Sequence, residues 1–266
     1  MEHSRSIESS DPRPLLPRIR GRRARPPGAV VYGPVTSRRL GRSLGVNLAR
    51  PGGRNCSFNC VYCEYPPQRC DGPFGDWPTP LAVATALAGA LRRCGPLDSI
   101  TISGSGEPTL HPDFAAVVDQ VLVEARRVRP GVPVRILTNG ESAVRQQVRD
   151  ALDRLDERIV TLDAGAGRVD RPGPRSPLGS IVYGISLLRD VALQSCFIDG
   201  IVSNVDDESV REWADLVAEL QPNHVQILTI SRRAAVVDAR PVSGHQLEEI
   251  ARVLRERTGI EARVFA

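Results

Sequence analysis

Short β-rich runs alternate with amphipathic helical patterns from residue 43 onward, and this alternation constrains the fold more than any other feature of the sequence. Six helical patterns separate seven predicted strands, at 43–48, 98–103, 133–138, 158–162, 195–202, 224–230 and 260–265. Such alternation predicts an α/β fold with a mostly parallel sheet and right-handed crossovers. About six strand-helix units favour a partial (βα)6 barrel, or an open doubly wound sheet, over a closed eight-unit barrel.

The helical patterns are clearest where apolar residues recur at one-face spacing. One pattern follows the cap-like pair Thr79-Pro80, and a second covers 114–122. Further stripes lie at 144–152, 181–188, 210–220 and, after Ser243, 247–254. In either fold the ligand site lies at the C-terminal ends of the parallel strands, so we expect functional residues there.

Three cysteines stand close together in the loop after the first of these strands. Cys56, Cys60 and Cys63 fall within eight residues, and no cysteine precedes them. A structural zinc site usually has four protein ligands, whereas a four-iron cluster held by three thiolates keeps one iron open for a ligand. The loop therefore predicts cluster binding. A zinc knuckle with Cys70 as fourth ligand, and unconnected buried thiols, remain alternatives.

The spacing Cys-x3-Cys-x2-Cys, with Tyr62 before the last cysteine, resembles the signature of the radical S-adenosylmethionine superfamily. After the second predicted strand, Gly104-Ser105-Gly106-Glu107 resembles the Gly-Gly-Glu motif of that superfamily, with Ser105 where glycine is frequent. We expect the glycines to permit close approach of the cofactor's amino-acid moiety and Glu107 to pair with its ammonium group. A turn before a helix is the structural alternative.

Two further strand ends carry weaker similarities. Asn139, in Thr-Asn-Gly after the third strand, and Asp163, after the fourth, resemble cofactor-contacting positions of the superfamily. A satisfied turn asparagine and a capping aspartate are equally consistent with these residues. Tyr62 is expected to pack on or near adenine, or else to brace the cysteine loop.

Within the superfamily, residues 33–45 resemble a group of iron-sulfur oxidoreductases related to wyosine-forming tRNA enzymes. Those tRNA enzymes carry an additional N-terminal cysteine set, which this sequence lacks before Cys56. The departure counts against formation of the tRNA tricycle. The resemblance spans 31–230 and narrows the subgroup without naming a substrate.

The resemblance implies a [4Fe-4S] cluster held by Cys56, Cys60 and Cys63, with S-adenosyl-L-methionine as cofactor. Reductive cleavage of that cofactor yields a 5′-deoxyadenosyl radical, which abstracts hydrogen from a small metabolite, a peptide or an RNA. A flavodoxin or ferredoxin would supply the electron, and a partner protein would present a large substrate. A glycyl-radical-enzyme activating enzyme and a zinc-binding nucleic-acid module are the rival functions.

Charge and composition exclude other classes. All 35 basic residues are arginine, which removes lysine Schiff-base chemistry and the P-loop lysine. Residues 1–28 hold seven arginines against three acidic residues, so we expect a disordered tail or an RNA-contacting arm before one domain at 29–266. No run of about 18 apolar residues and no signal-peptide block occurs, which predicts a cytoplasmic protein without a membrane span.

The remaining candidate residues have plain alternatives. We expect Cys70, Cys94 and Cys196 to be ordinary thiols, with an auxiliary cluster as the alternative. His111 and His224 are expected to be structural. Arg232-Arg233 follows the sixth strand and predicts either a solvated turn or a contact to an anion at the rim of the barrel, beside a lateral opening bordered by 33–45.

Overall fold

The computed structural model of the chain describes residues 29–49, 55–67, 77–165, 169, 177–232, 234 and 239–266. The tail at 1–28, Cys70 and Arg233 lie outside the described residues. Nine strands form one curled sheet in the order β1-β2-β3-β4-β5-β6-β7-β9, and β8 pairs with β6 beside this path. The strands are β1 (Val31–Ser37), β2 (Gly41–Val46), β3 (Ser99–Ile102), β4 (Val134–Thr138), β5 (Glu157–Thr161), β6 (Val191–Gly200), β7 (His224–Thr229), β8 (Ala239–Pro241) and β9 (Ala262–Phe265).

The parallel strands are those that the sequence predicts. Neighbours from β2 to β7, and then β9, pair in parallel. β1 and β9 stand at the two ends of the described order, so the sheet is a half-barrel with an open side. The expectation of a partial barrel is confirmed, and the α/β class with it.

The hairpin of β1 and β2 is absent from the prediction. β1 runs antiparallel to β2, with a register shift between Tyr32 and Val35. Gly33 and Pro34 occupy the irregular part of β1. Glycine and proline inside a run argue against a strand, which is why the sequence pattern hides this one. β8 has only three residues and is too short to give a pattern.

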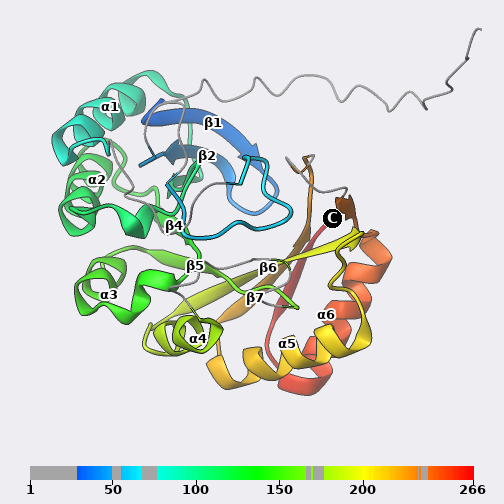
Figure 1. Cartoon of the computed structure of the whole chain (residues 1–266). Coiled ribbons are helices and arrows are strands. Elements are labelled where there is room, and N and C mark those ends of the chain that lie inside the picture. The colour runs from blue at the N-terminus through cyan, green and yellow to red at the C-terminus, as the bar shows by residue number, and fades with distance from the viewer. Residues whose placement is uncertain are drawn as a thin grey trace, which may run out of the picture.

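The described part of the chain has six α-helices, and they cover the convex side of the sheet (Figure 1). They are α1 (Pro80–Arg93), α2 (Phe114–Val128), α3 (Gln146–Leu152), α4 (Leu178–Ser186), α5 (Asp207–Leu220) and α6 (Gly244–Thr258), with 3₁₀ turns η1 (Pro108–Leu110) and η2 (Glu141–Val144). Thr79 caps α1 and Ser243 caps α6, as their sequence positions predict. None of the helices in the described part of the chain has the length and apolar character of a membrane span.

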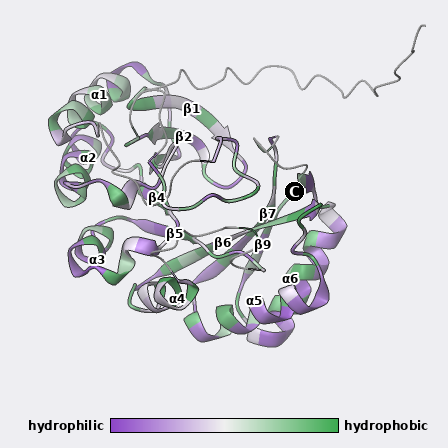
Figure 2. Ribbon diagram, in the orientation of Figure 1, coloured by the Kyte–Doolittle hydropathy of each residue, from purple (hydrophilic) through white to green (hydrophobic). Residues whose placement is uncertain are grey.

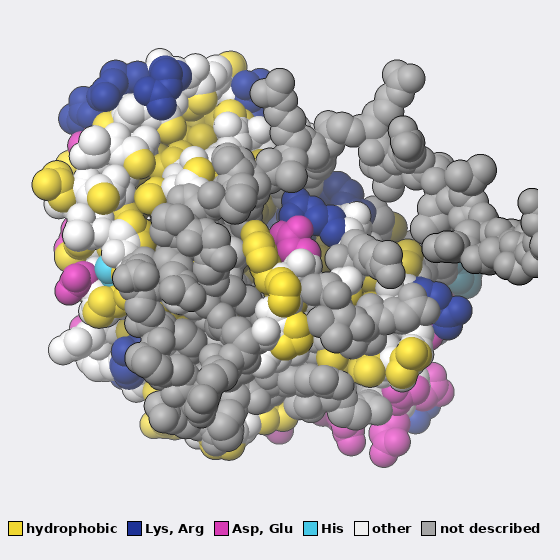
Figure 3. Space-filling model, turned by 45° about the horizontal axis from the view of Figure 1, so that its top comes forward, with side chains coloured by type: hydrophobic (Ala, Val, Ile, Leu, Met, Phe, Trp, Pro, Cys, Tyr) yellow, Lys and Arg dark blue, Asp and Glu magenta, His cyan; other side chains and the backbone are white. Residues whose placement is uncertain are grey.

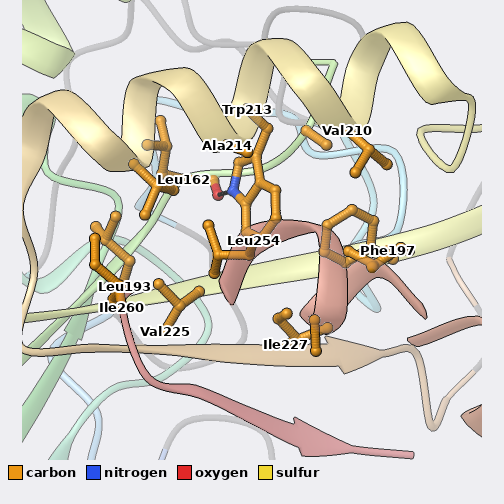
Figure 4. Close-up of a cluster of buried hydrophobic side chains, with 14 of the residues drawn as sticks. Leu162, Leu193, Phe197, Val210, Trp213, Ala214, Val225, Ile227, Leu254 and Ile260 are labelled. Carbon is orange, nitrogen blue, oxygen red and sulfur yellow. Dashed lines mark hydrogen bonds between the residues drawn. The ribbon is translucent and has the colours of Figure 1, made fainter. Parts of the chain in front are cut away.

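Two apolar clusters join the helices to the sheet, and green apolar faces alternate with purple polar ones along the helices of Figure 2. In the C-terminal half, Trp213 on α5 packs edge-on against Phe197 with ring centroids 5.2 Å apart, as Figure 4 shows. The Trp213 indole also donates to Ser195 Oγ at 2.9 Å, so its buried N–H is satisfied. Leu81, in the apolar pattern after Thr79-Pro80, and Val144, in the pattern at 144–152, differ from expectation, because they are 73% and 43% exposed.

Strand alternation decides which side chains face the interior of the half-barrel, which we call the lumen. Leu193 and Phe197 pack toward the helices, so Gln194 and Cys196 on the same strand point to the concave side. An apolar layer crosses the lumen and consists of Leu40, Leu137, Ile159 and Ala192. Gln194 and Gln226 lie one inward-facing position beyond Ala192 and His224, toward the C-terminal ends of the strands.

Candidate functional site

The cysteine loop follows β2 and lies against the C-terminal ends of the neighbouring strands. Cys56, Cys60 and Cys63 are each partly exposed and form no disulfide. The Phe58 side chain is only 1% exposed and anchors the loop in the same core cluster that Cys56 and Cys60 touch. Within the loop, the Cys63 N–H donates to the Cys60 carbonyl at 3.0 Å. The thiols thus sit on a loop whose middle is buried.

The segment after β3 contacts this loop through its backbone. The Glu107 N–H donates to the Asn55 carbonyl at 2.6 Å, directly before Cys56. A Cβ at Gly106 would lie 2.1 Å from that carbonyl oxygen, and a Cβ at Gly104 would lie 1.9 Å from Asn47 Oδ1. Both glycines are therefore required by packing within the chain itself, a reason that the sequence analysis does not contain.

Asn47, at the end of β2, is a site residue that the sequence analysis misses. Its Oδ1 accepts hydrogen bonds from the Ser105 N–H at 3.2 Å and the Ala49 N–H at 3.1 Å. Its Nδ2 donates to the Ser105 hydroxyl at 3.4 Å, so the serine that departs from the family pattern has a partner here. The available signal was an asparagine near the end of the strand predicted at 43–48, which the structure ends at Val46.

The Glu107 carboxylate is 3% exposed and joins β3 to β4. Its Oε1 accepts hydrogen bonds from the Thr109 N–H at 3.0 Å, the Thr109 hydroxyl at 2.6 Å and the Thr138 hydroxyl at 2.6 Å. Its Oε2 accepts one from the Asn139 N–H at 2.7 Å. Burial raises the pKa of Glu107, and these hydrogen bonds act in the opposite direction. The residue caps η1, which is the structural alternative for this motif.

Asn139 links the end of β4 to the cysteine loop. Its Nδ2 donates to Ser57 Oγ at 3.1 Å, and its Oδ1 accepts from the Glu141 N–H at 3.1 Å. Ser57 lies between the first two cysteines and is 2% exposed. The loop is thus fixed to β4 as well as to β3.

Tyr62 and Asp163 meet at the end of β5. The Tyr62 hydroxyl donates to Asp163 Oδ2 at 2.5 Å, and the Cys196 N–H donates to Asp163 Oδ1 at 2.6 Å. Burial, followed by the charge of Asp163, raises the pKa of Tyr62 well above its usual value, and the same two causes raise the pKa of Cys196. Tyr62 therefore braces the cysteine loop against the sheet, and the Cys196 thiol stays protonated.

Other expected residues lie at the rim or elsewhere. Arg232 forms an ion pair with Glu64, next to Cys63, and its Nη1 lies 2.6 Å from Glu64 Oε1. Basic and acidic side chains also lie side by side near the middle of the face in Figure 3. His111 accepts from the Asp113 N–H and contacts Pro78 O at 2.8 Å, a structural role. His224 lies at the opposite end of the sheet.

The cysteine loop offers three thiols, which are the ligand type that iron–sulfur clusters use. Among the described residues, no group of three or more His, Cys, Asp or Glu side chains converges closely enough to hold one metal ion. A four-iron cluster receives each thiolate on a different iron atom, so its ligands are spread apart. Three partly exposed thiols on one anchored loop, none of them in a disulfide, are compatible with that requirement.

Comparison with known proteins gives the family. A sequence model of the Radical SAM superfamily matches residues 51–217. A UPF0026 protein of Helicobacter pylori is 30% identical over 76% of this chain and 67% of its own length, and one of Synechocystis is 31% identical over 74% of each. A protein of Brachyspira hyodysenteriae named GTPase Obg is 29% identical, but this chain spans only 34% of its length.

Solved structures agree on the fold. A structure of TYW1 with a lysine-pyruvate adduct bound has a TM-score of 0.59 and 18% identity, over 83% of this chain and 75% of that one. Streptococcus suis SuiB bound to S-adenosylmethionine has a TM-score of 0.55 and 12% identity, over 80% of this chain and 48% of that one. With the three-cysteine loop at the strand ends and the superfamily match over most of the half-barrel, the chain belongs to the radical SAM superfamily and is a radical SAM enzyme.

Proposed function

We propose that Cys56, Cys60 and Cys63 hold a [4Fe-4S] cluster and that the strand ends beside it bind S-adenosyl-L-methionine. This pair supplies reductive cleavage of the sulfonium to a 5′-deoxyadenosyl radical, which abstracts hydrogen from a substrate. The observation that carries the proposal is the attachment of the cysteine loop to three consecutive strand ends. Asn55, Ser57 and Tyr62 make those attachments to β3, β4 and β5.

The attachments would fix the thiolates relative to the cofactor pocket. Glu107, which bonds to Asn139, would form one edge of this pocket with it, and the bonded pair Tyr62 and Asp163 would form the other. Preorganised ligands of this kind lower the cost of orienting the reacting groups. In this proposal, Tyr62 positions the loop and lies near the adenine.

Glu107 has an unused acceptor position for the predicted contact with the ammonium group of the cofactor. A carboxylate offers about four lone-pair positions on two oxygens. Three hydrogen bonds fall on Oε1 and one falls on Oε2. We therefore assign the ammonium of the cofactor to Oε2, while Oε1 maintains the shape of the strand ends. Gly104, Ser105 and Gly106 would line the same edge.

The proposal extends to the partners and the domain. A flavodoxin or ferredoxin would reduce the cluster in the cytoplasm, and residues 29–266 would act as one domain without help from the tail. The substrate is a small metabolite, a peptide or an RNA. A glycine in a partner enzyme is the alternative substrate, and incubation with candidate partners under the assay conditions below separates it from the others.

The test is cofactor cleavage by protein reconstituted anaerobically with iron and sulfide. With dithionite as reductant, the wild type should form 5′-deoxyadenosine from S-adenosylmethionine, and Cys63→Ala should form none. Cys94→Ala, which changes the thiol that follows the C-terminal end of α1, is the matched control and should retain the activity. If Cys63→Ala cleaves the cofactor at the wild-type rate, the proposed ligand set is wrong.

A further inference from the structure

An arginine side chain enters the lumen below the cysteine loop. Arg39 belongs to the turn between β1 and β2. Its Nη1 donates to Gln194 Oε1 on β6 and to Gln226 Oε1 on β7, the second at 3.4 Å. These glutamines are 155 and 187 positions away in the sequence, so the guanidinium crosses from the first hairpin to the far wall of the half-barrel.

The charge of Arg39 lacks a carboxylate partner among the described residues. Its hydrogen bonds go to two neutral amides. Arginines elsewhere in the fold do pair with acids, as Arg135 does with Glu157 at 2.6 Å. Burial lowers the pKa of Arg39, although a guanidinium remains protonated at any ordinary pH. An inward-facing cation without a counter-ion is costly, and proteins usually pair or solvate it.

The unused donors of Arg39 face accessible space. Nε and Nη2 make no hydrogen bond to the described residues, and neither is among the buried polar atoms that lack a partner. Ile159 and Ala192 belong to the apolar layer. Each lies two residues before the next inward-facing residue of its strand, Thr161 or Gln194, so the layer closes the lumen on the N-terminal side. The accessible space is therefore on the side of the cysteine loop.

The surroundings on that side point the same way. Cys196 is the next inward-facing residue after Gln194 on β6, and Tyr62 packs in the same apolar cluster as Cys196. Both contact Asp163 at the end of β5, which we assign to the cofactor pocket. The guanidinium thus lies on the side of the apolar layer that faces the proposed cofactor pocket.

We propose that Arg39 binds an anionic oxygen pair of the substrate, a carboxylate or a phosphate, below the cofactor. Nε and Nη2 form one side of the planar fork, which receives two oxygens in parallel hydrogen bonds. The glutamines on the other side hold the guanidinium in place. This inference rests on the proposed function, because it assigns the lumen to the substrate. It limits that substrate to one whose acidic group reaches the interior of the half-barrel.

The test measures binding of acetate and of inorganic phosphate by nuclear magnetic resonance line broadening. Arg39→Gln removes the charge, and Arg38→Gln is the matched control because Arg38 is the exposed neighbour in the same turn. We expect wild type and Arg38→Gln to bind one of the two anions equally, and Arg39→Gln to bind it at least about tenfold more weakly. The anion that binds tells whether the substrate group is a carboxylate or a phosphate.

Two readouts keep this inference separate from the proposed function. Anion binding is measured on the protein as isolated and again after reconstitution with S-adenosylmethionine present, while cofactor cleavage is followed on the same samples. Loss of cleavage in every sample, with Arg39-dependent anion binding retained, would reject the cluster assignment alone. Weaker cofactor binding in Arg39→Gln, or anion binding that is absent or equal in both variants, would overturn the substrate subsite.

A second pair of variants tests the proposal if Arg39→Gln fails to fold. If Arg39→Gln lost its native circular dichroism spectrum, Arg39→Lys would replace it, since lysine keeps the charge but lacks the fork. Weaker anion binding by Arg39→Lys than by Arg38→Lys supports the subsite. Equal binding by these two variants contradicts it.

Discussion

The two ends of the half-barrel treat acidic side chains in opposite ways. At the C-terminal end, Glu107 and Asp163 are 3% and 1% exposed and accept hydrogen bonds from hydroxyls and backbone N–H groups. At the N-terminal end, Glu157 and Asp156 pair with arginines and keep about a quarter or more of their side-chain surface in solvent. Only the first arrangement couples separate strands to the cysteine loop.

The contrast shows which end of the half-barrel buries acidic groups at a cost in folding free energy. A buried carboxylate requires nearly complete hydrogen bonding, and its loss leaves buried donors unsatisfied. Ion pairs between partly exposed side chains contribute about 0–1 kcal/mol. The N-terminal end, with a cavity of about 340 Å³ lined by such pairs, is ordinary charged surface. The C-terminal end buries carboxylates at a cost in folding free energy that the stability of the fold does not require.

Among the variants that test this contrast, Gly106→Ala should have the largest effect, because it displaces the cysteine loop. The new Cβ would lie 2.1 Å from the Asn55 carbonyl oxygen, which belongs to the backbone and has little freedom to move. We expect overpacking to cost about 1–3 kcal/mol and to displace the cysteine loop. Iron content after reconstitution should therefore fall sharply. Gly131→Ala, with nothing within 4 Å of its Cβ, is the control and should bind iron as the wild type does.

Replacing a carboxylate by an amide at each end of the half-barrel should have the next largest effect. In Glu107→Gln, the amide nitrogen must face the N–H of either Thr109 or Asn139, so one buried donor loses its acceptor. We expect a loss of about 1–3 kcal/mol, against less than about 1 kcal/mol for Glu157→Gln. Unfolding midpoints at equal iron content measure the difference. Equal losses at both ends would remove the distinction between them.

The same pair separates two roles of Glu107. Calorimetry should show weaker S-adenosylmethionine binding by Glu107→Gln and unchanged binding by Glu157→Gln. If the affinity of Glu107→Gln for the cofactor equals that of the wild type, the carboxylate only caps η1 and connects the strands.

Tyr62→Phe should have the smallest effect. It removes one hydrogen bond to Asp163, which still accepts the Cys196 N–H, so we expect a loss of about 1 kcal/mol. Tyr183→Phe on the exposed face of α4 should change nothing measurable, since Tyr183 is 61% exposed. A loss well above 2 kcal/mol in Tyr62→Phe would show that the hydroxyl does more than brace the loop.

The sequence predicts the parallel strands and the site region because both follow from local patterns. Apolar runs at the period of a strand identify the parallel strands, and the motifs stand at the ends of those runs. Arg39, Asn47 and Ser57 escape prediction, since each gains its role only from a partner far along the chain. The glycines show the same limit, because the sequence indicates that a side chain is excluded without showing what excludes it.

The most direct measurement of the central claim is the iron content and electron paramagnetic resonance of reconstituted variants. The wild type, Cys94→Ala and Cys196→Ala should hold about four irons per chain, and S-adenosylmethionine should alter the signal of the reduced cluster. Cys56→Ala, Cys60→Ala and Cys63→Ala should each lose the cluster. Retention of about four irons in any of these three, or loss of iron in Cys196→Ala, would contradict the assignment of the cysteine loop as the sole cluster ligand.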